Sequence, residues 1–436
     1  MKPIRIGLLG IGTVGGGTFE VLTRNEREIT RRIGRPLVIT RVADKDLDLA
    51  GRVTGGAAAI GDDAFDVVRD PDIEIVVELI GGTGVAKELV LEAIEHGKHV
   101  VTANKALLAT HGNEIFEAAR AKGVSVAFEA AVGGGIPIIK ALREGLVANH
   151  IEWIAGIING TTNFILSEMR SRGVDFATAL ADAQARGYAE TDPTFDIEGV
   201  DAAHKLALMS AMAFGIPVSF DQAHIEGISG VKAADIAYAE ELGYRVKLLG
   251  ITRRRPTGIE LRVHPTLIPV DRLIANVEGV MNAVLVMGDA VGPTLYYGAG
   301  AGAQPTASAV IADLVDVARL ITADPEHRVP HLAFQPDRLS DDPVLDMAEV
   351  ETAYYLRLRL DDRPGSLAEV TRILSDEGIS IESALQKAPA EEFTQADLVL
   401  LTHTTLERAA RLAIARIEAL EASHGSVVLL RVEKLA

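Results

Sequence analysis

The chain contains no cysteine in its 436 residues. Disulfide bonds, catalytic thiolates and cysteine-ligated zinc sites are therefore excluded. Aromatic residues make up only 4 % of the sequence, so the buried cores must depend on Ala, Val, Ile and Leu. Such a composition suits parallel sheets that are covered by helices.

Positive charge is also in deficit, with 43 Lys and Arg against 61 Asp and Glu and a net charge of -18. This balance repels nucleic acid and anionic lipid, and we expect neither as a partner. No stretch approaches the roughly 20 apolar residues that cross a bilayer. The start, MKPIRIGLLGIG, resembles a signal peptide only loosely, because glycines interrupt its apolar run and no clean cleavage site follows. We therefore expect a soluble, cytoplasmic protein.

The length exceeds that of one ordinary core and predicts two or three domains. Up to about residue 130, helical stretches alternate with strand-like runs at 4–10, 37–43, 73–80, 99–103 and 124–130. Strands that alternate with helices predict right-handed βαβ units and an open parallel sheet. The fold class is therefore α/β, with a Rossmann-type doubly wound sheet in residues 1–130.

The pattern changes twice after this sheet. Residues 131–302 carry longer helices and amphipathic strands, and a helix at 305–321 is expected to return to the first domain, which then also includes about 303–340. The stretch 323–344, rich in Pro, Asp and Arg, predicts a linker. Residues 352–434 then follow a βαββαβ pattern, which predicts a separate ferredoxin-like unit.

The first predicted strand runs directly into Gly10-Ile11-Gly12-Thr13-Val14-Gly15, a G-x-G-x-x-G motif. In such a turn the first glycine permits the bend, the second lets backbone approach a pyrophosphate, and the third allows close packing of helix on strand. The amides of the following helix would face the phosphates. Glycine clusters also serve as plain turns, but the position after the first strand favours dinucleotide binding.

The acidic residue expected after the second strand is Asp44, which lies 29 positions after Gly15 instead of the usual spacing of about 20. Asp44 could accept a hydrogen bond from the ribose of NAD, whereas Lys45 could meet the additional phosphate of NADP. Asp44 could also be an ordinary surface residue at a strand end. The sequence leaves the choice between NAD and NADP open.

Asp201 and Lys205 are four positions apart in a predicted helix and share one face. By spacing alone this is most often an exposed ion pair of little energetic weight.

A series of motifs changes that interpretation. In order along the chain these are GLLGIGTVGGG, TANKALLA, FEAAVGGGIPII, NGTTNFIL, RGYAETDPTFDIEGVDAAHKL and GAGAGAQPTASAV. From residue 1 to about 325 the chain resembles homoserine dehydrogenase, and the segment DDRPGSLAEVTRIL resembles the start of an ACT domain. The resemblance implies NAD(P)-linked reduction of aspartate 4-semialdehyde to homoserine, on the route to threonine and methionine. It also implies that residues 131–302 form an α+β catalytic and dimerisation domain and that the protein is a homo-oligomer, dimer or tetramer.

The resemblance implies roles for three charged residues. Lys205 is the candidate proton donor, because an ammonium within hydrogen-bond reach can protonate and stabilise a developing alkoxide. Asp201 lies beside the reacting oxygen and keeps that lysine charged. Lys105, after the fourth predicted strand, contacts cofactor or substrate and assists proton transfer, unless it is a solvated surface charge.

Further site residues follow from the same resemblance. Glu190 takes the substrate ammonium. The remaining residues line the substrate pocket, namely Gly187, Thr161 and Thr162, or border the cofactor, namely Thr83 and Gly302. His204 is expected to be structural.

A monovalent cation, such as sodium, is implied beside the glycine run at 133–135. The resemblance assigns its ligands to Glu129, Val132, Gly134 and Ile136. Oxygen-only ligation suits a hard cation. The alternative is that the glycine run is only a flexible turn between domains.

Two rival functions can be compared with this one. Aspartate semialdehyde dehydrogenase needs a cysteine thiolate, which this chain lacks. A non-catalytic amino-acid sensor is disfavoured because Glu190, Asp201, Lys205 and Lys105 all remain.

The ACT-like unit is expected to bind a small amino acid such as threonine at the turn 361–367, with Asp361 or Asp362 taking its ammonium. The alternative is a purely structural dimerisation module. Because the site residues all precede 303, truncation near Ala348 is expected to leave a folded, active enzyme.

Overall fold

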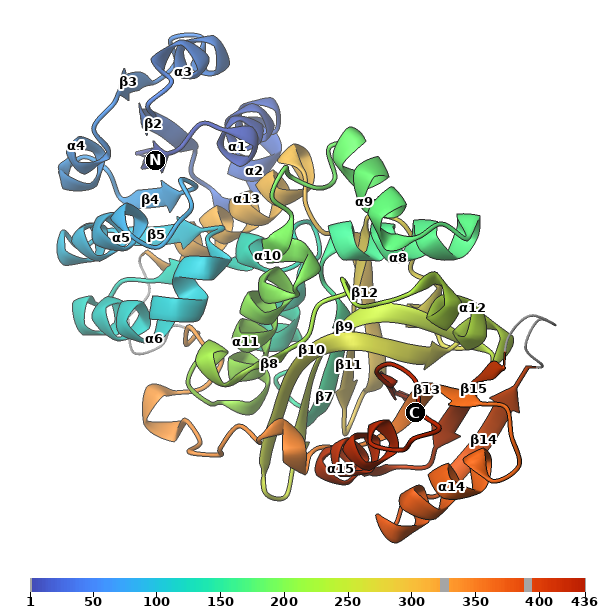
Figure 1. Ribbon diagram of the computed structural model, residues 1–436. Helices are drawn as coiled ribbons and strands as arrows, with labels where there is room; N and C mark the ends of the chain where they lie inside the picture. The colour runs from blue at the N-terminus through green and yellow to red at the C-terminus, as the bar shows by residue number, and fades with distance from the viewer. Residues whose placement is uncertain (1, 322–328, 388–393, 436) are drawn as a thin grey trace. The chain divides into compact units, whose positions relative to one another are not determined.

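The computed structural model describes residues 2–321, 329–387 and 394–435 (Figure 1). The first part of the expected linker at 323–344 therefore lies outside the described residues, as does the stretch 388–393 of the expected ACT unit. Over the described ranges, no helix combines the length and the apolar character that crossing a membrane requires. The chain divides into two compact units, the first comprising Met1–Gly160, Asp201–Ala223 and Val280–Asp342, and the second comprising Thr161–Val200, His224–Gly279 and Pro343–Ala436.

The first unit begins with the predicted parallel sheet. Its strands are β1 (Ile4–Leu9), β2 (Leu37–Ala43), β3 (Ala59–Gly61), β4 (Ile75–Glu78), β5 (His99–Thr102) and β6 (Val126–Ala127), in the spatial order β3-β2-β1-β4-β5-β6. This order reverses between β1 and β4, which is the switch point where doubly wound sheets bind ligands. The Rossmann prediction is confirmed.

Two details of that sheet differ from the sequence prediction. The strand β3 was not expected, because it has only three residues and no buried face. The strand expected at 124–130 is reduced to Val126–Ala127, and Glu129–Ala131 forms a turn of 3-10 helix instead. The extended backbone ends there because the amide of Glu129 bonds to the buried carboxylate of Asp313 at 2.7 Å instead of to a neighbouring strand.

Helices cover this sheet and the returning helix lies among them. They are α1 (Thr13–Arg24), α2 (Glu26–Ile33), α3 (Leu47–Thr54), α4 (Ala64–Arg69), α5 (Val85–Glu95), α6 (Lys105–Lys122) and α13 (Ala303–Leu320). Val310, Leu314 and Val317 of α13 join the same buried core as Ile6 and Ile39 of the sheet. Figure 1 shows α13 beside α1, where a Cβ on Gly17 would lie 2.6 Å from the carbonyl oxygen of Ala303. A helix from far along the chain thus completes the first core.

The first unit also contains the antiparallel strands β7 (Ile151–Ile157), β11 (Met281–Gly288) and β12 (Gly292–Ala299), in the order β12-β11-β7. The helix α11 (Val200–Phe214) supplies residues from Asp201 onward to this unit. Nearly all of α11 is buried, because Ala, Leu and Met occupy its whole circumference.

The second unit combines a helical part with a mixed sheet. Its first elements are α8 (Gly160–Arg172), α9 (Phe176–Ala185), α10 (Thr194–Ile197), β8 (His224–Ile225), α12 (Ala233–Glu241), β9 (Tyr244–Arg255) and β10 (Gly258–Pro269). The C-terminal elements are β13 (Glu351–Asp361), α14 (Ser366–Asp376), β14 (Ile381–Gln386), β15 (Gln395–Thr402), β16 (Thr405–Leu406), α15 (Glu407–Glu418) and β17 (Val428–Val432). The predicted βαββαβ order is confirmed, and α14 and α15 pack through one apolar core on the sheet.

The C-terminal βαββαβ elements do not form a sheet of their own. The strand order is β9-β10-β17-β13-β15-β14, so β17 lies between β10 and β13. It pairs parallel with β10, matching Thr266 with Arg431 and Leu267 with Val432. Beyond this pairing, the buried Arg262 of β10 donates to Glu433 at 2.5 Å. The last strand, β17, therefore pairs both with β13 of the ACT elements and with β10 of the preceding part of the unit.

Candidate active site

The glycine motif forms the turn between β1 and α1. Gly10 has a φ of +92°, and a Cβ there would lie 2.8 Å from the carbonyl oxygen of Leu79. A Cβ on Gly15 would collide with the carbonyl oxygen of Gly10. Around Gly12, by contrast, a Cβ would meet no heavy atom within 4 Å. Gly10 and Gly15 thus allow the turn to form, and Gly12 leaves open space beside it.

The amides at the start of α1 lie beside this space. Thr13 is the first residue of the helix and is exposed, and Val14 is half-buried. No side chain caps this helix end. Free amides at a helix N-terminus attract anions such as a pyrophosphate.

The acidic residue at the end of β2 contacts the turn directly. The carboxylate of Asp44 accepts the amide of Ile11 at 2.6 Å and the amide of Asp46 at 2.8 Å. Lys45 instead donates to the carbonyl oxygen of Asp62 at 3.0 Å. Asp44 is thus fixed beside the phosphate-binding turn, where its Oδ2 already accepts the amide of Ile11.

A buried carboxylate that the sequence analysis missed orders the loop after β4. Glu78 accepts the amides of Ile80 at 2.9 Å and Gly81 at 3.0 Å, and the hydroxyl of Thr102 at 2.7 Å. Thr83 is exposed in this loop. A single acidic residue at the end of a strand forms no recognisable sequence motif, so the role of Glu78 becomes visible only from its burial in the structure.

Three charged side chains meet at the start of α11. Lys205 donates to Asp201 Oδ2 at 2.6 Å and to the carbonyl oxygen of Ile158 at 2.8 Å. Lys105, at the start of α6, lies 3.2 Å from Asp201 Oδ1. Asn159 donates to Asp201 Oδ2 at 2.9 Å. The structure therefore brings together Lys105, Asp201 and Lys205, which the sequence placed far apart or on a helix surface.

Burial distinguishes this cluster from an exposed pair. The side chain of Asp201 is 6 % exposed and that of Lys205 is 11 % exposed. Burial alone would raise the pKa of Asp201, but Lys205 and Lys105 beside it lower that pKa to about 2. The carboxylate is therefore charged at any working pH, with two lysines facing it. The interpretation of Asp201 and Lys205 as a solvated surface pair is wrong.

His204, between these residues in sequence, has a different environment. Its ring packs edge-on against Phe220 with 4.2 Å between the ring centres. Burial lowers the pKa of His204 to about 4, so the imidazole is neutral at pH 7.

The remaining substrate residues belong to the second unit. Gly187 follows the C-terminal end of α9 with a φ of +73°, and Glu190 lies in the exposed loop after it. The hydroxyl of Thr161 donates to the carbonyl oxygen of Tyr188 at 2.7 Å, and Gln184 donates to the carbonyl oxygen of Glu190 at 3.0 Å. These bonds hold the loop against α8 and α9. Thr162 is buried within α8.

Gly302 stands at the beginning of α13 with a φ of +125°. This conformation is strained for residues with a side chain. The carbonyl oxygen of Gly302 accepts the amide of Thr306 at 3.0 Å and so starts the helix.

The glycine run after Glu129 forms a compact turn. Gly133 and Gly134 both have positive φ, and a Cβ on Gly134 would collide with Gly300. The buried carboxylate of Glu129 accepts the amides of Ile139 at 2.9 Å and Lys140 at 2.8 Å. Burial raises the pKa of Glu129 to about 7. In the part of the chain that the structure describes, no three or more His, Asp or Glu side chains cluster in a way that could hold a metal ion.

Three family models match the chain. One described as the NAD-binding domain of homoserine dehydrogenase matches residues 10–129, one described as homoserine dehydrogenase matches 137–315, and one described as the ACT domain matches 354–422. The homoserine dehydrogenase of Pseudomonas aeruginosa is 62 % identical over 435 residues, which cover 100 % of both chains.

Solved structures agree with these matches. A homoserine dehydrogenase from Thiobacillus denitrificans superposes with a TM-score of 0.96 at 66 % identity, covering 100 % of this chain and 99 % of that one. A hyperthermophilic archaeal homoserine dehydrogenase in complex with NADPH superposes with a TM-score of 0.62 at 28 % identity, covering 73 % of this chain and 98 % of that one.

Proposed function

The chain belongs to the homoserine dehydrogenase family, and from that premise we propose that Lys205 is the proton donor in the interconversion of aspartate 4-semialdehyde and homoserine. The protein is an NAD(P)-dependent oxidoreductase. The bound cofactor supplies or accepts the hydride. The observation that carries the proposal is the buried cluster in which Lys205 and Lys105 share the carboxylate of Asp201.

The cluster fits the charge that develops during reduction. Reduction of an aldehyde turns its oxygen into an alkoxide, which needs a proton and a positive neighbour. Lys205 meets both needs, because Asp201 holds it by a charge-assisted hydrogen bond and favours its protonated form. Lys105 adds a second positive charge at the same carboxylate and assists the proton transfer.

Substrate selection rests on other residues. Glu190 takes the ammonium of homoserine, and Thr161 and Gly187 shape the loop on which Glu190 lies. Thr162, which is buried in α8, is assigned to the lining of the same pocket. These assignments follow from the family resemblance and from the bonds within the loop.

Cofactor binding is assigned to the first unit. The pyrophosphate is assigned to the turn formed by Gly10, Gly12, Thr13, Val14 and Gly15. The open space beside Gly12 supports this assignment. Asp44 and Lys45 select the ribose end, and Thr83, Lys105 and Gly302 lie toward the nicotinamide. The NADPH complex of the archaeal relative supports this use of the sheet.

We also propose a structural monovalent cation, such as sodium, at the turn after Glu129. Its ligands would be a carboxylate oxygen of Glu129 and the carbonyl oxygens of Val132, Gly134 and Ile136. The donor chemistry fits, because a carboxylate with two amide partners keeps further lone pairs. The carbonyl oxygen of Ile136 already accepts the amide of Ile138 at 2.8 Å, so its share would be the weakest.

Three functional domains and an oligomer complete the proposal. The domains are 1–130 with 303–340 for the cofactor, 131–302 for catalysis and dimerisation, and 352–434 for regulation by an amino acid such as threonine. The ACT match supports the last domain. β14 ends the strand order of the second unit, and an edge strand of this kind supports pairing with a second copy.

An absorbance assay at 340 nm tests the proposed reaction. Aspartate 4-semialdehyde is supplied with NADH or NADPH, and homoserine with the oxidised forms. Turnover in both directions is expected, and the ratio of kcat/KM values gives the cofactor preference. Glu190→Gln is expected to raise KM for homoserine by about tenfold, as loss of a charged hydrogen bond does. Absence of turnover with all four combinations would leave only the sensor alternative.

A further inference from the structure

One carboxylate of the second unit connects the ACT elements to the rest of that unit. Glu226, directly after β8, accepts two bonds from Arg431 at 2.7 and 3.0 Å and one from Arg411 at 2.9 Å. Its Oε1 also lies 3.0 Å from His224 Nε2. Burial raises the pKa of Glu226, but hydrogen bonds from His224 and Arg431 outweigh this and lower it well below its usual range. Glu226 is therefore a permanent anion.

Its partners are anchored within the ACT elements. Arg431 lies on β17, is completely buried, and also bonds to Glu407 at 2.6 and 2.9 Å. Glu407 begins α15 and accepts the hydroxyl of Tyr354 on β13 at 2.9 Å. Arg411, one turn along α15, bonds to the same Glu407 at 2.9 Å. Two arginines therefore connect Glu226 to two strands and a helix of the ACT elements.

On its other side, the segment of Glu226 packs on the end of α10. The amide of Ile228 donates to the carbonyl oxygen of Ile197 at 2.8 Å. A Cβ on Gly227 would lie 2.5 Å from Glu198 Cα, so backbone lies directly on backbone. Gly199, with a φ of +83°, lies against the same segment, because a Cβ there would lie 3.3 Å from the Ile225 side chain and 3.5 Å from the carbonyl oxygen of Glu226. At Gly227, therefore, the two segments meet backbone to backbone.

This contact lies at the end of the loop that carries Glu190. From Glu190 the chain passes through Asp192, whose carboxylate caps Thr194, into α10 and then to Gly199. We propose that Glu226 is a positioning residue. Its ion pairs with Arg411 and Arg431 hold the segment that packs on the end of α10, and this fixes the substrate loop and sets the affinity for homoserine. The proposal rests on the function proposed above for Glu190.

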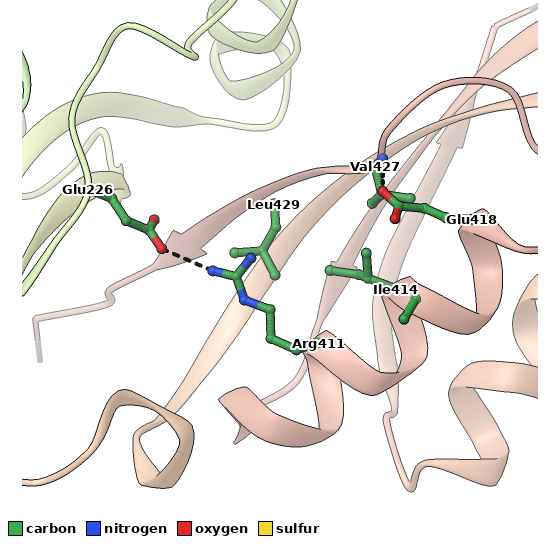
Figure 2. A pocket seen from close by; sticks show the side chains of 7 residues that line it. Glu226, Arg411, Ile414, Glu418, Val427 and Leu429 are labelled. Carbon is green, nitrogen blue, oxygen red and sulfur yellow. Dashed lines mark hydrogen bonds and ion pairs between the residues drawn. The ribbon is translucent and has the colours of Figure 1, made fainter.

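The Arg411 contact is the accessible part of this connection. Figure 2 shows Arg411 reaching toward Glu226. The two side chains lie at a cleft of about 470 Å3, which is also lined by Ile414, Glu418, Val427 and Leu429. The side chain of Arg411 is 51 % exposed, whereas that of Arg431 is 1 % exposed. Arg411 can therefore be replaced without opening the buried network, which makes it the better test position.

The experiment compares Arg411→Gln, Glu226→Gln and Arg411→Lys in the full-length protein. Arg411→Gln and Glu226→Gln are expected to raise KM for homoserine about three- to tenfold with kcat nearly unchanged, the usual range for coupling through a packed network. Arg411→Lys keeps the charge and is expected to restore most of the affinity. Amide hydrogen exchange of the peptide 186–200 is expected to rise in the two Gln variants.

Arg416→Gln is the matched control. Arg416 lies on the same helix, but pairs with Asp376 at 2.7 Å and Glu377 at 2.5 Å within the ACT elements. It should change neither KM nor the exchange of 186–200. An unchanged KM in both Gln variants, or a raised KM without faster exchange of the peptide, would overturn the proposal. A fall in kcat at constant KM would overturn it as well.

The role of Glu190 is tested separately. If Glu190→Gln leaves KM unchanged, the proposed function of Glu190 fails. The transmission through Glu226 is then judged by exchange of the peptide 186–200 alone, and unchanged exchange in Arg411→Gln and Glu226→Gln refutes it.

Discussion

Lys205 bonds to Asp201 at 2.6 Å across one turn of α11, and both side chains are buried. Lys205→Ala removes the proposed proton donor and should lower kcat by at least about 100-fold, the usual contribution of a positioned acid. Cofactor affinity should stay nearly constant, because the phosphate-binding turn is untouched. Stopped-flow or steady-state rates at 340 nm and a fluorescence titration with NADPH measure the two quantities. Normal turnover of the variant would eliminate Lys205 as proton donor.

His204 should make stability depend on pH. The pKa of His204 is about 4 in the folded protein, against 6.5 for an exposed histidine. Between these values the unfolded chain binds a proton that the folded chain does not, so stability is complete above pH 6.5 and falls as pH decreases toward 4. The loss is on the order of 3 kcal/mol, since one pKa unit is 1.36 kcal/mol.

His204→Gln should remove that part of the pH dependence while keeping kcat within about threefold at pH 7, because the ring is neutral there. The measurement is the free energy of unfolding in urea at pH 5 and pH 7 for both proteins. Equal slopes of stability with pH in the variant and the parent would contradict the assignment. A loss of activity comparable to that of Lys205→Ala would give His204 a catalytic role instead.

Two glycines of the phosphate-binding turn should respond differently to substitution. Gly12→Val places a side chain in the open space and should weaken cofactor binding at least about tenfold, or 1.4 kcal/mol, without unfolding the protein. The φ of Gly12 is −58°, so the substitution costs little backbone strain. Gly15→Ala collides with Gly10 and should lower stability by about 1–3 kcal/mol. Thermal unfolding and cofactor titration of both variants separate the two effects; unchanged affinity in Gly12→Val would place the phosphates elsewhere.

We expect that the ACT unit cannot be removed in the way that the sequence suggested. Truncation near Ala348 deletes β17 and leaves the buried Arg262 without Glu433, and breaking a buried ion pair costs about 3–5 kcal/mol. It also leaves the edge of β10 unpaired. We therefore expect the truncated chain to be insoluble or unfolded, measured by circular dichroism and the 340 nm assay. A folded, active product of residues 1–348 would show that β17 is dispensable.

Effector binding is better tested by a point substitution. Asp361 is held by His424 at 2.7 Å, whereas Asp362 is exposed and accepts only a long bond of 3.3 Å from Gln386 among the contacts described. Asp362→Asn should raise the threonine concentration for half-inhibition about tenfold, as expected for a charged hydrogen bond, with basal kcat unchanged. Initial rates across millimolar threonine measure this. Equal inhibition of both proteins would exclude Asp362, and no inhibition of the parent by any pathway amino acid would favour a purely structural module.

The sequence predicted the features that have a local pattern. Gly10, Gly12 and Gly15 identify the turn because each position requires a glycine for its own local structural reason. The alternation of strands and helices predicted the parallel sheet. The resemblance to a family also indicated Asp201 and Lys205, although their spacing alone suggested a surface pair.

The missed features depend on contacts between distant residues. Glu78 shows its role only when Thr102 and the amides after β4 surround it. Asp313 lies on α13, yet it stops the strand expected at Glu129. The pairing of β10 with β17 has no counterpart in any local pattern, since parallel partners can lie anywhere along the chain.

The pairing of β10 with β17 also has a consequence for folding during synthesis on the ribosome, because the two strands are made at different times. Leu267 leaves the ribosome long before its partner Val432, on the order of ten seconds at about 5–20 residues per second. During that interval the edge of β10 that pairs with β17 is open, and Arg262 has Glu260 beside it but lacks Glu433. The sheet of the second unit can therefore close only after the last strand has been translated.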